Sequence, residues 1–267
     1  MKIGCCLNMV ATKPDGTGME HLKAMKECGY DYVEMPMAQM MALSDEEFAA
    51  LADELKELDL PCETSNNLFP VSLRLTGPEV DQDAILAYAE KAFARAKQLG
   101  IEYCVFGSGP AKNVPEGFPM EEGYAQVVAL LRAIAPIAQK NDVTIVIEPL
   151  RRAECNLINS FAEGVQLAKD ADVPGVKVLV DFYHLTVEQE PVANLEKDGA
   201  EYLRHVHFAN PTGRVYPVSA DEADYLPFVK ALKIAGYDAR VSCEAYAPNG
   251  FEADAPAALK MLRELFA

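Results

Sequence analysis

The chain has 267 residues, half of them hydrophobic, and its formal charge at pH 7 is −17. That length suits one α/β barrel and is enough to bury a large core without disulfides. The acidic excess repels a phosphate backbone and no Lys/Arg cluster offsets it, so we expect no nucleic-acid partner. Because no apolar run approaches the roughly 20 residues of a membrane helix, we expect no membrane association either.

The seven cysteines contain no CxxC pair, and several of them lie in strand-like apolar runs. This distribution is typical of reduced, mostly buried thiols and argues against a disulfide scaffold or a zinc finger. The first ten residues, MKIGCCLNMV, lack the basic end, long apolar stretch and cleavage site of a secretion signal. We therefore expect a cytoplasmic protein.

Short β-rich runs alternate with longer amphipathic stretches along the whole chain. The first four strands are predicted at KIGCCLNM (from Lys2), DYVEM (from Asp31), LPCETS (from Leu60) and IEYCVFG (from Ile101). The last four are predicted at VTIVIEP (from Val143), VKVLVD (from Val176), HVHFAN (from His205) and RVSCEAY (from Arg240). Helical patterns between and after them include residues 44–58, 79–99, 120–140, 160–169, 191–203, 221–235 and 254–266, and a further one should stop at Gly29.

The ends of several helices carry recognisable signals. Ser44 followed by Glu47 has the spacing of a capping box, and Gly29, Gly100 and Gly236 stand where helices should stop. Eight strands that each precede a helix imply parallel pairing, and eight such units at this length favour closure into a barrel. We therefore predict a single-domain (β/α)₈ barrel over residues 1–267. No GxGxxG motif follows the first strand, which removes the main argument for a dinucleotide-binding fold.

An ionisable residue stands at the carboxyl end of each of the last four predicted strands. These residues are Glu148, Asp181, His207 and Glu244. In a barrel such ends converge on one mouth, where three carboxylates repel one another unless a cation neutralises them. The sequence therefore predicts one divalent metal, and this oxygen and nitrogen ligand set suits Mn²⁺, Mg²⁺ or Co²⁺.

Three of the four histidines fall within one 24-residue window, His184, His205 and His207. His205 and His207 are two residues apart on a strand and should face the same side. Only one of them is needed for the metal, so His205 is predicted to contact the substrate. His184, three residues after Asp181, is a second substrate-binding candidate.

Further candidates lie in the loops of the same rim. Glu154 and Asn66 are predicted to hydrogen-bond substrate hydroxyls, and Arg214 is a possible substrate ligand. For Arg214, Arg151 and Arg152, a solvated surface charge is an equally good interpretation. Asn66 and Asn67 could equally be present because Asn is a favoured residue in loops. Glu34 and Glu63, near the ends of the second and third strands, either line the mouth or have a structural role.

The segments IEPLRRAECN, VDFYH, HVHFAN and CEAY resemble the sugar isomerase and epimerase branch of the xylose-isomerase-like barrels. That branch includes ketose 3-epimerases and hydroxypyruvate isomerase. The resemblance runs through almost the whole chain and is sharpest from Val143 to Tyr246. It implies a metal bound by the same four strand-end residues and a substrate gripped by Glu154 and His184. One position differs, because the epimerases carry an Arg six residues after the metal histidine, where this chain has Gly213 and then Arg214.

The resemblance implies an isomerase that acts on a small sugar, with a ketose 3-epimerase favoured and Mn²⁺ as the first choice of metal. No Lys/Arg-rich loop indicates a phosphate site, which favours a free sugar or a small derivative and leaves phosphorylation open. Glu148 and Glu244 would remove and return a proton through a metal-stabilised cis-enediolate. Return to the same carbon gives epimerisation and return to its neighbour gives aldose–ketose isomerisation, and the sequence leaves both open. The sequence does not determine the oligomeric state, although barrels of this kind often pair, which leaves a homo-oligomer open.

Three other functions are alternatives for a barrel of this kind. A lyase, dehydratase or C-glycoside-cleaving enzyme would use the same metal site and differ by loss of a leaving group. A non-catalytic sugar-binding barrel is a second alternative, against which the complete set of four ligands argues. An abasic-site endonuclease would need more histidine ligands and a basic surface, and the four histidines and the charge of −17 argue strongly against it.

Overall fold

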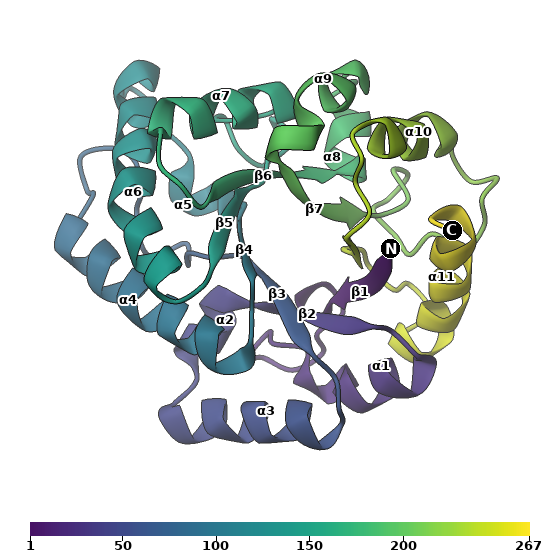
Figure 1. The fold of residues 1–267 in the computed structure, drawn as a ribbon. Helices are drawn as coiled ribbons and strands as arrows, with labels where there is room; N and C mark the ends of the chain where they lie inside the picture. Colours follow the sequence, from purple (N-terminus) through teal and green to yellow (C-terminus); the bar gives the residue numbers. More distant parts are fainter.

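The computed structural model describes all residues, 1–267, and shows a closed barrel of parallel strands in the order β1 to β8 (Figure 1). The predicted fold class is therefore confirmed. Pairing of β1 with β8 closes the barrel, with Lys2 opposite Arg240 and Cys5 opposite Cys243. The strands are β1 (Lys2–Cys6), β2 (Tyr32–Pro36), β3 (Cys62–Asn66), β4 (Tyr103–Phe106), β5 (Thr144–Ile147), β6 (Val176–Asp181), β7 (Leu203–Phe208) and β8 (Arg240–Cys243).

Helices surround the barrel and cover its outer face (Figure 1). The longer ones are α3 (Asp45–Glu57), α4 (Gln82–Leu99), α6 (Met120–Lys140), α7 (Phe161–Ala171), α9 (Ala193–Tyr202), α10 (Leu226–Ile234) and α11 (Phe251–Leu265). The shorter ones are η1 (Leu7–Met9), η2 (Met19–His21), α1 (Leu22–Cys28), α2 (Met37–Ala42), α5 (Gly109–Lys112) and α8 (Phe182–Val187). No helix combines the length and apolar character that crossing a membrane requires.

The expected helix signals act as predicted at several ends. The Ser44–Glu47 capping box opens α3, and Gly29 and Gly100 end α1 and α4 in the left-handed conformation. The last connection differs, because α10 begins at Leu226, five residues later than expected. The preceding segment turns back toward the mouth, where Val215 pairs with Asn210 and with Tyr246.

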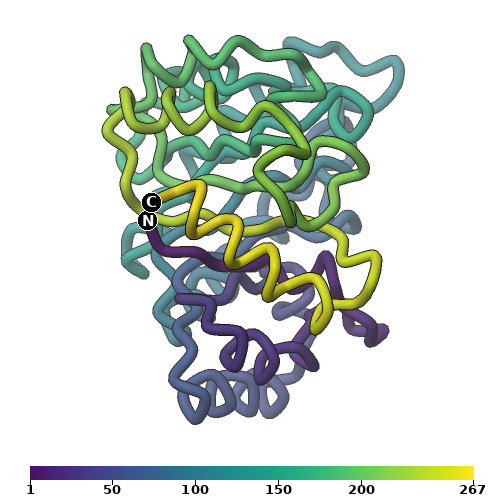
Figure 2. Tube along the Cα trace, turned by 90° about the vertical axis from the view of Figure 1, so that its right-hand side faces the viewer, coloured from purple at the N-terminus to yellow at the C-terminus, as the bar shows by residue number.

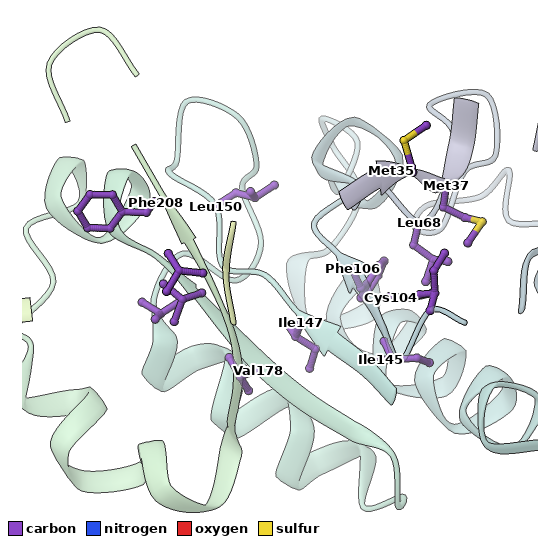
Figure 3. Packing of buried hydrophobic residues seen from close by; sticks show 14 of the residues in the cluster. Met35, Met37, Leu68, Cys104, Phe106, Ile145, Ile147, Leu150, Val178 and Phe208 are labelled. Atoms are coloured by element: carbon purple, nitrogen blue, oxygen red, sulfur yellow. The ribbon is translucent and has the colours of Figure 1, made fainter. Parts of the chain in front are cut away.

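The main hydrophobic core lies between the sheet and the helices and contains 74 buried residues (Figure 3). A second cluster of only three, Val105, Val146 and Leu179, lies inside the barrel, one or two residues before the ends of β4, β5 and β6. The rest of the interior at this depth is polar, because Glu34, Thr64, His205 and Ser242 are completely buried there. The two chain ends lie close together at the opposite end of the barrel, where Met1 pairs with Asp238 (Figures 1 and 2).

Candidate metal centre and active site

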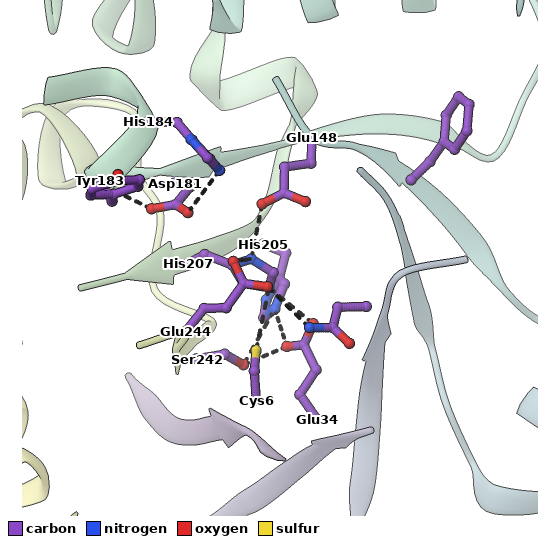
Figure 4. Close-up of polar contacts among 12 residues, drawn as sticks. Cys6, Glu34, Glu148, Asp181, Tyr183, His184, His205, His207, Ser242 and Glu244 are labelled. Carbon is purple, nitrogen blue, oxygen red and sulfur yellow. Dashed lines mark hydrogen bonds and ion pairs between the residues drawn. The ribbon is translucent and has the colours of Figure 1, made fainter. Parts of the chain in front are cut away.

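Four ionisable side chains meet at the carboxyl end of the barrel (Figure 4). Asp181 and His207 stand at the ends of β6 and β7, and Glu148 and Glu244 follow β5 and β8 directly. One ligand atom from each lies within 4.8 Å of those of the other three. His207 Nδ1 is 3.2 Å from Glu148 Oε1 and 3.2 Å from Glu244 Oε2. The structure thus brings together the four predicted ligands, and their binding of a metal stays a prediction.

Burial and mutual interaction shift the pKa values of these four ionisable side chains. Burial and the neighbouring Glu244 raise the pKa of Glu148, and burial raises the pKa of Asp181 to about 7. Burial opposes ionisation of Glu244 too, but His207 and Arg214 outweigh it and lower the pKa of Glu244. Burial likewise opposes the charge on His207, and Glu34 and Glu244 outweigh it and raise the pKa of His207 well above its usual value.

A divalent cation fits this arrangement. Asp181 Oδ2 is buried and has no hydrogen-bond partner, which leaves an anionic oxygen free to act as a ligand. Three carboxylates and one imidazole form an open, hard donor set of the kind that Mn²⁺, Mg²⁺ or Co²⁺ accept. A cation would also oppose the burial and the carboxylate repulsion that raise the pKa of Glu148 and Asp181.

Two further residues predicted to bind substrate flank the group. His184, on α8, is buried, and its Nε2 lies 3.6 Å from Asp181 Oδ2 and 3.9 Å from Glu154 Oε2. Burial and the nearby Arg214 lower the pKa of His184 to about 3, which keeps its imidazole neutral. His184 Nδ1 accepts the backbone N–H of Arg151, so the free Nε2 points toward the carboxylates. This geometry suits a neutral hydrogen-bond contact to a substrate oxygen.

Arg214 enters the site although it stands one residue later than the epimerase arginine. Gly213 and Arg214 have φ values of 79° and 52°, and this left-handed pair turns the chain back over the mouth. Arg214 Nη2 lies 2.5 Å from Glu244 Oε2 and 3.5 Å from Asp181 Oδ2, and Nη1 lies 3.5 Å from Glu154 Oε1. This turn compensates for the one-residue difference in spacing from His207, so the guanidinium of Arg214 faces the carboxylates.

A cavity of about 450 Å³ opens beside the four strand-end residues. Its size suits a small ligand, and only three of its 14 lining residues are hydrophobic, which favours a ligand rich in hydroxyls. Asn66, Glu154 and Arg214, all predicted to bind substrate, line it together with Glu148 and Glu244. The others are Asn8, Met9, Asn67, Gly107, Ser108, Gly109, Pro110, Leu150 and Ala153.

Of the predicted substrate ligands, neither His184 nor His205 lines this cavity. His205 lies below it. It does face the same side of β7 as His207, with ring centroids 5.1 Å apart, but it lies two residues, roughly 6–7 Å, deeper in the barrel. There it is completely buried, and its Nε2 lies 2.7 Å from Glu34 Oε2. His205 therefore contacts the equally buried Glu34 in the interior, and a contact between His205 and substrate stays a prediction.

Glu63 also lies away from the mouth. It is the second residue of β3, and it bonds Lys2 and Arg240 at the end of the barrel where the strands begin. Arg152 pairs with Glu188 on the exposed rim, which agrees with the interpretation of Arg152 as a surface charge.

Sequence reasoning missed two polar residues of the cavity, Asn8 and Ser108. Asn8 follows β1 on the 3₁₀ turn η1 and accepts a hydrogen bond of 2.9 Å from Asn66 Nδ2. Asn66 Nδ2 also donates to Glu244 Oε1 at 3.0 Å. Both missed residues stand just past the end of an apolar strand, the same signal that identified the four ionisable residues.

Comparison with known proteins agrees with this architecture. The model of the xylose isomerase-like TIM barrel family matches residues 22–265. A ketose 3-epimerase of Arthrobacter globiformis is 26% identical over 273 residues, which cover 100% of this chain and 91% of that protein. An L-ribulose 3-epimerase of Methylomonas sp. (strain DH-1) is 25% identical over 82% of this chain and 74% of its own length.

Among solved structures, a D-psicose 3-epimerase determined in the presence of D-fructose superimposes with a TM-score of 0.85 at 20% identity. That alignment covers 100% of this chain and 99% of the other, and at this identity it shows the shared fold alone. The chain therefore belongs to the xylose isomerase-like TIM barrel family, as an enzyme of the isomerase and epimerase class.

Proposed function

We propose that the protein is a divalent-metal-dependent epimerase or isomerase of a small free sugar, with 3-epimerisation of a ketose favoured. The observation that carries the proposal is the convergence of Glu148, Asp181, His207 and Glu244 beside a polar cavity of about 450 Å³. The ketose 3-epimerases among the relatives support the choice of substrate class.

The lining of the cavity favours an uncharged sugar. Arg214 is its only cationic residue, and that guanidinium is already paired with Glu244. A phosphate would meet the carboxylates of Glu148, Glu154 and Glu244 without a free cation of the protein to balance it. Hydroxyl groups, in contrast, find donors and acceptors on Asn8 and Ser108 as well as on these carboxylates.

The proton transfers belong to Glu148 and Glu244, the two carboxylates of the group that also line the cavity. One of them removes the proton from the carbon next to the carbonyl, and one returns a proton to the opposite face of that carbon. Glu154 and His184 orient the sugar hydroxyls, and Arg214 holds an oxygen at the rim. Glu148, Asp181, His207 and Glu244 would hold a divalent metal, which would supply Lewis acidity at the carbonyl end of the sugar.

The test is solvent exchange. Enzyme stripped with a chelator is incubated in D₂O with free ketoses, alone or with Mn²⁺, Mg²⁺ or Co²⁺. Metal-dependent deuterium at C3 with a C3 epimer as product supports 3-epimerisation, and an aldose product supports isomerisation. Loss of water or of another leaving group would replace the proposal by a lyase.

Two substitutions connect this exchange to the residues. Glu148→Gln and Glu244→Gln should each abolish deuterium incorporation and leave the fold intact. Glu63→Gln is the matched control, because the same change is made at the other end of the barrel. Near-normal exchange in both active-site variants would contradict the assignment. Homo-oligomerisation stays a prediction, which sedimentation of the purified protein tests.

A further inference from the structure

A completely buried carboxylate, Glu34 of β2, lies beneath the proposed metal centre (Figure 4). It reaches across the barrel to β7, which is not a neighbour of β2 in the sheet. A buried carboxylate is costly unless hydrogen bonds compensate for the lost hydration. The barrel does not need polar groups at this depth, because Val105, Val146 and Leu179 fill the other half of its interior.

The two oxygens of Glu34 have different partners. Oε2 accepts from Thr64 Oγ1 at 2.7 Å and from Ser242 Oγ at 2.5 Å, and it lies 2.7 Å from His205 Nε2. Three donors from three strands therefore fix the orientation of the carboxylate. Oε1 has a single partner, His207 Nε2, at 2.9 Å.

This hydrogen bond determines which nitrogen of His207 is available to bind a metal ion. Because Oε1 can only accept, His207 Nε2 carries the proton. The other nitrogen, Nδ1, is the one that faces Glu148 and Glu244 at 3.2 Å. A carboxylate that accepts the distal N–H of a metal-ligating histidine fixes the tautomer and the orientation of its ring.

We propose that Glu34 is a positioning residue of the metal centre: its Oε1 holds the Nε2 proton of His207 and keeps Nδ1 turned toward the other ligands. Thr64, Ser242 and His205 act through Glu34, because they hold the carboxylate in place. The inference rests on the proposed function, in that His207 must ligate a metal.

The experiment titrates Co²⁺ into chelator-stripped protein and records the visible absorption of the ion, which reports both affinity and ligand geometry. Glu34→Gln should weaken Co²⁺ binding about 10- to 100-fold, the usual effect of losing such a partner, and should change the Co²⁺ spectrum. Thr64→Val removes one of the three donors to Oε2 with little change in shape and should weaken binding a few-fold. If Glu34→Gln does not fold, Thr64→Val carries the test.

Glu63→Gln is the matched control and should bind Co²⁺ within about twofold of the wild type, because Glu63 makes no contact with the histidines. A purely structural role for Glu34 would lower the unfolding temperature of the metal-free protein and leave Co²⁺ affinity and spectrum unchanged. That result in folded Glu34→Gln and Thr64→Val would overturn this inference alone. Failure of the wild type to bind Co²⁺ would overturn the proposed function and this inference with it.

Discussion

Substitution of Gly107 by alanine should displace a proposed metal ligand and leave the fold unchanged. Gly107 follows β4 directly, and a Cβ added there would lie 2.2 Å from Glu148 Oε2. The backbone of Gly107 does not have a positive φ, so alanine is compatible with its conformation. The atom that must give way is the far end of a flexible side chain, so the strain falls on the carboxylate of Glu148.

The size of the effect follows from this distance. Ordinary contact begins near 3.4 Å, so Glu148 Oε2 has to retreat from 2.2 Å by about 1.2 Å. A misplacement of about 1 Å at a reacting group costs roughly 100-fold in rate. We therefore expect Gly107→Ala to lower kcat/KM for the sugar by about two orders of magnitude and to weaken metal binding. Steady-state kinetics and a metal titration measure the two effects.

Gly117→Ala separates this effect from a loss of stability. Gly117 lies on the same connection with open space around its Cα, but its φ is +79°. A left-handed alanine costs about 1–2 kcal/mol, so this variant should lose stability and keep full activity. Gly107→Ala should show the reverse. Activity within threefold of the wild type in Gly107→Ala would refute the reasoning.

Three further outcomes are expected. Metal at 100 times its Kd should add about 2.7 kcal/mol to the free energy of unfolding. Calorimetry should record this as a rise in Tm of roughly 5–10 °C. Equal Tm values with and without chelator would contradict the metal site. Arg214→Ala removes a charge-assisted hydrogen bond worth about 1.5–3 kcal/mol, so KM for the sugar should rise roughly 10- to 100-fold without weaker metal binding; an unchanged KM would exclude Arg214 as a substrate ligand. Burial opposes ionisation of Glu20, yet hydrogen bonds from the N–H groups of Thr12 and Lys13 lower the pKa of Glu20 to about 2. A lowered folded-state pKa adds stability above pH 4.5 that is lost as the pH falls toward 2, so chemical denaturation should find Glu20→Gln less stable than wild type at pH 6 and the two equal near pH 2.

The barrel and the convergence of the four strand-end residues were predictable because both depend on the order of strands and helices along the chain. Alternation of strands and helices fixes parallel pairing, and the carboxyl end of each strand fixes which rim a residue occupies. The same rule left two interpretations open for Glu63, a place at the mouth or a structural role. Strand β3 runs from Cys62 to Asn66, so Glu63 stands three residues before its carboxyl end and lies at the opposite end of the barrel.

Side-chain contacts across the barrel could not be predicted from the sequence. Glu34 meets His205 and His207 from a strand that is not their neighbour, and this depends on the tilt and closure of the whole sheet. Arg214 reaches the carboxylates only because two successive residues adopt the left-handed conformation, which an arginine rarely does. Its side chain therefore could not be placed from its distance to His207 along the chain.

The most direct test of the metal centre is an anomalous difference map from crystals soaked with Mn²⁺. A single peak bonded to Glu148, Asp181, His207 Nδ1 and Glu244 is the predicted result. No peak there, or coordination by other residues, would contradict the account.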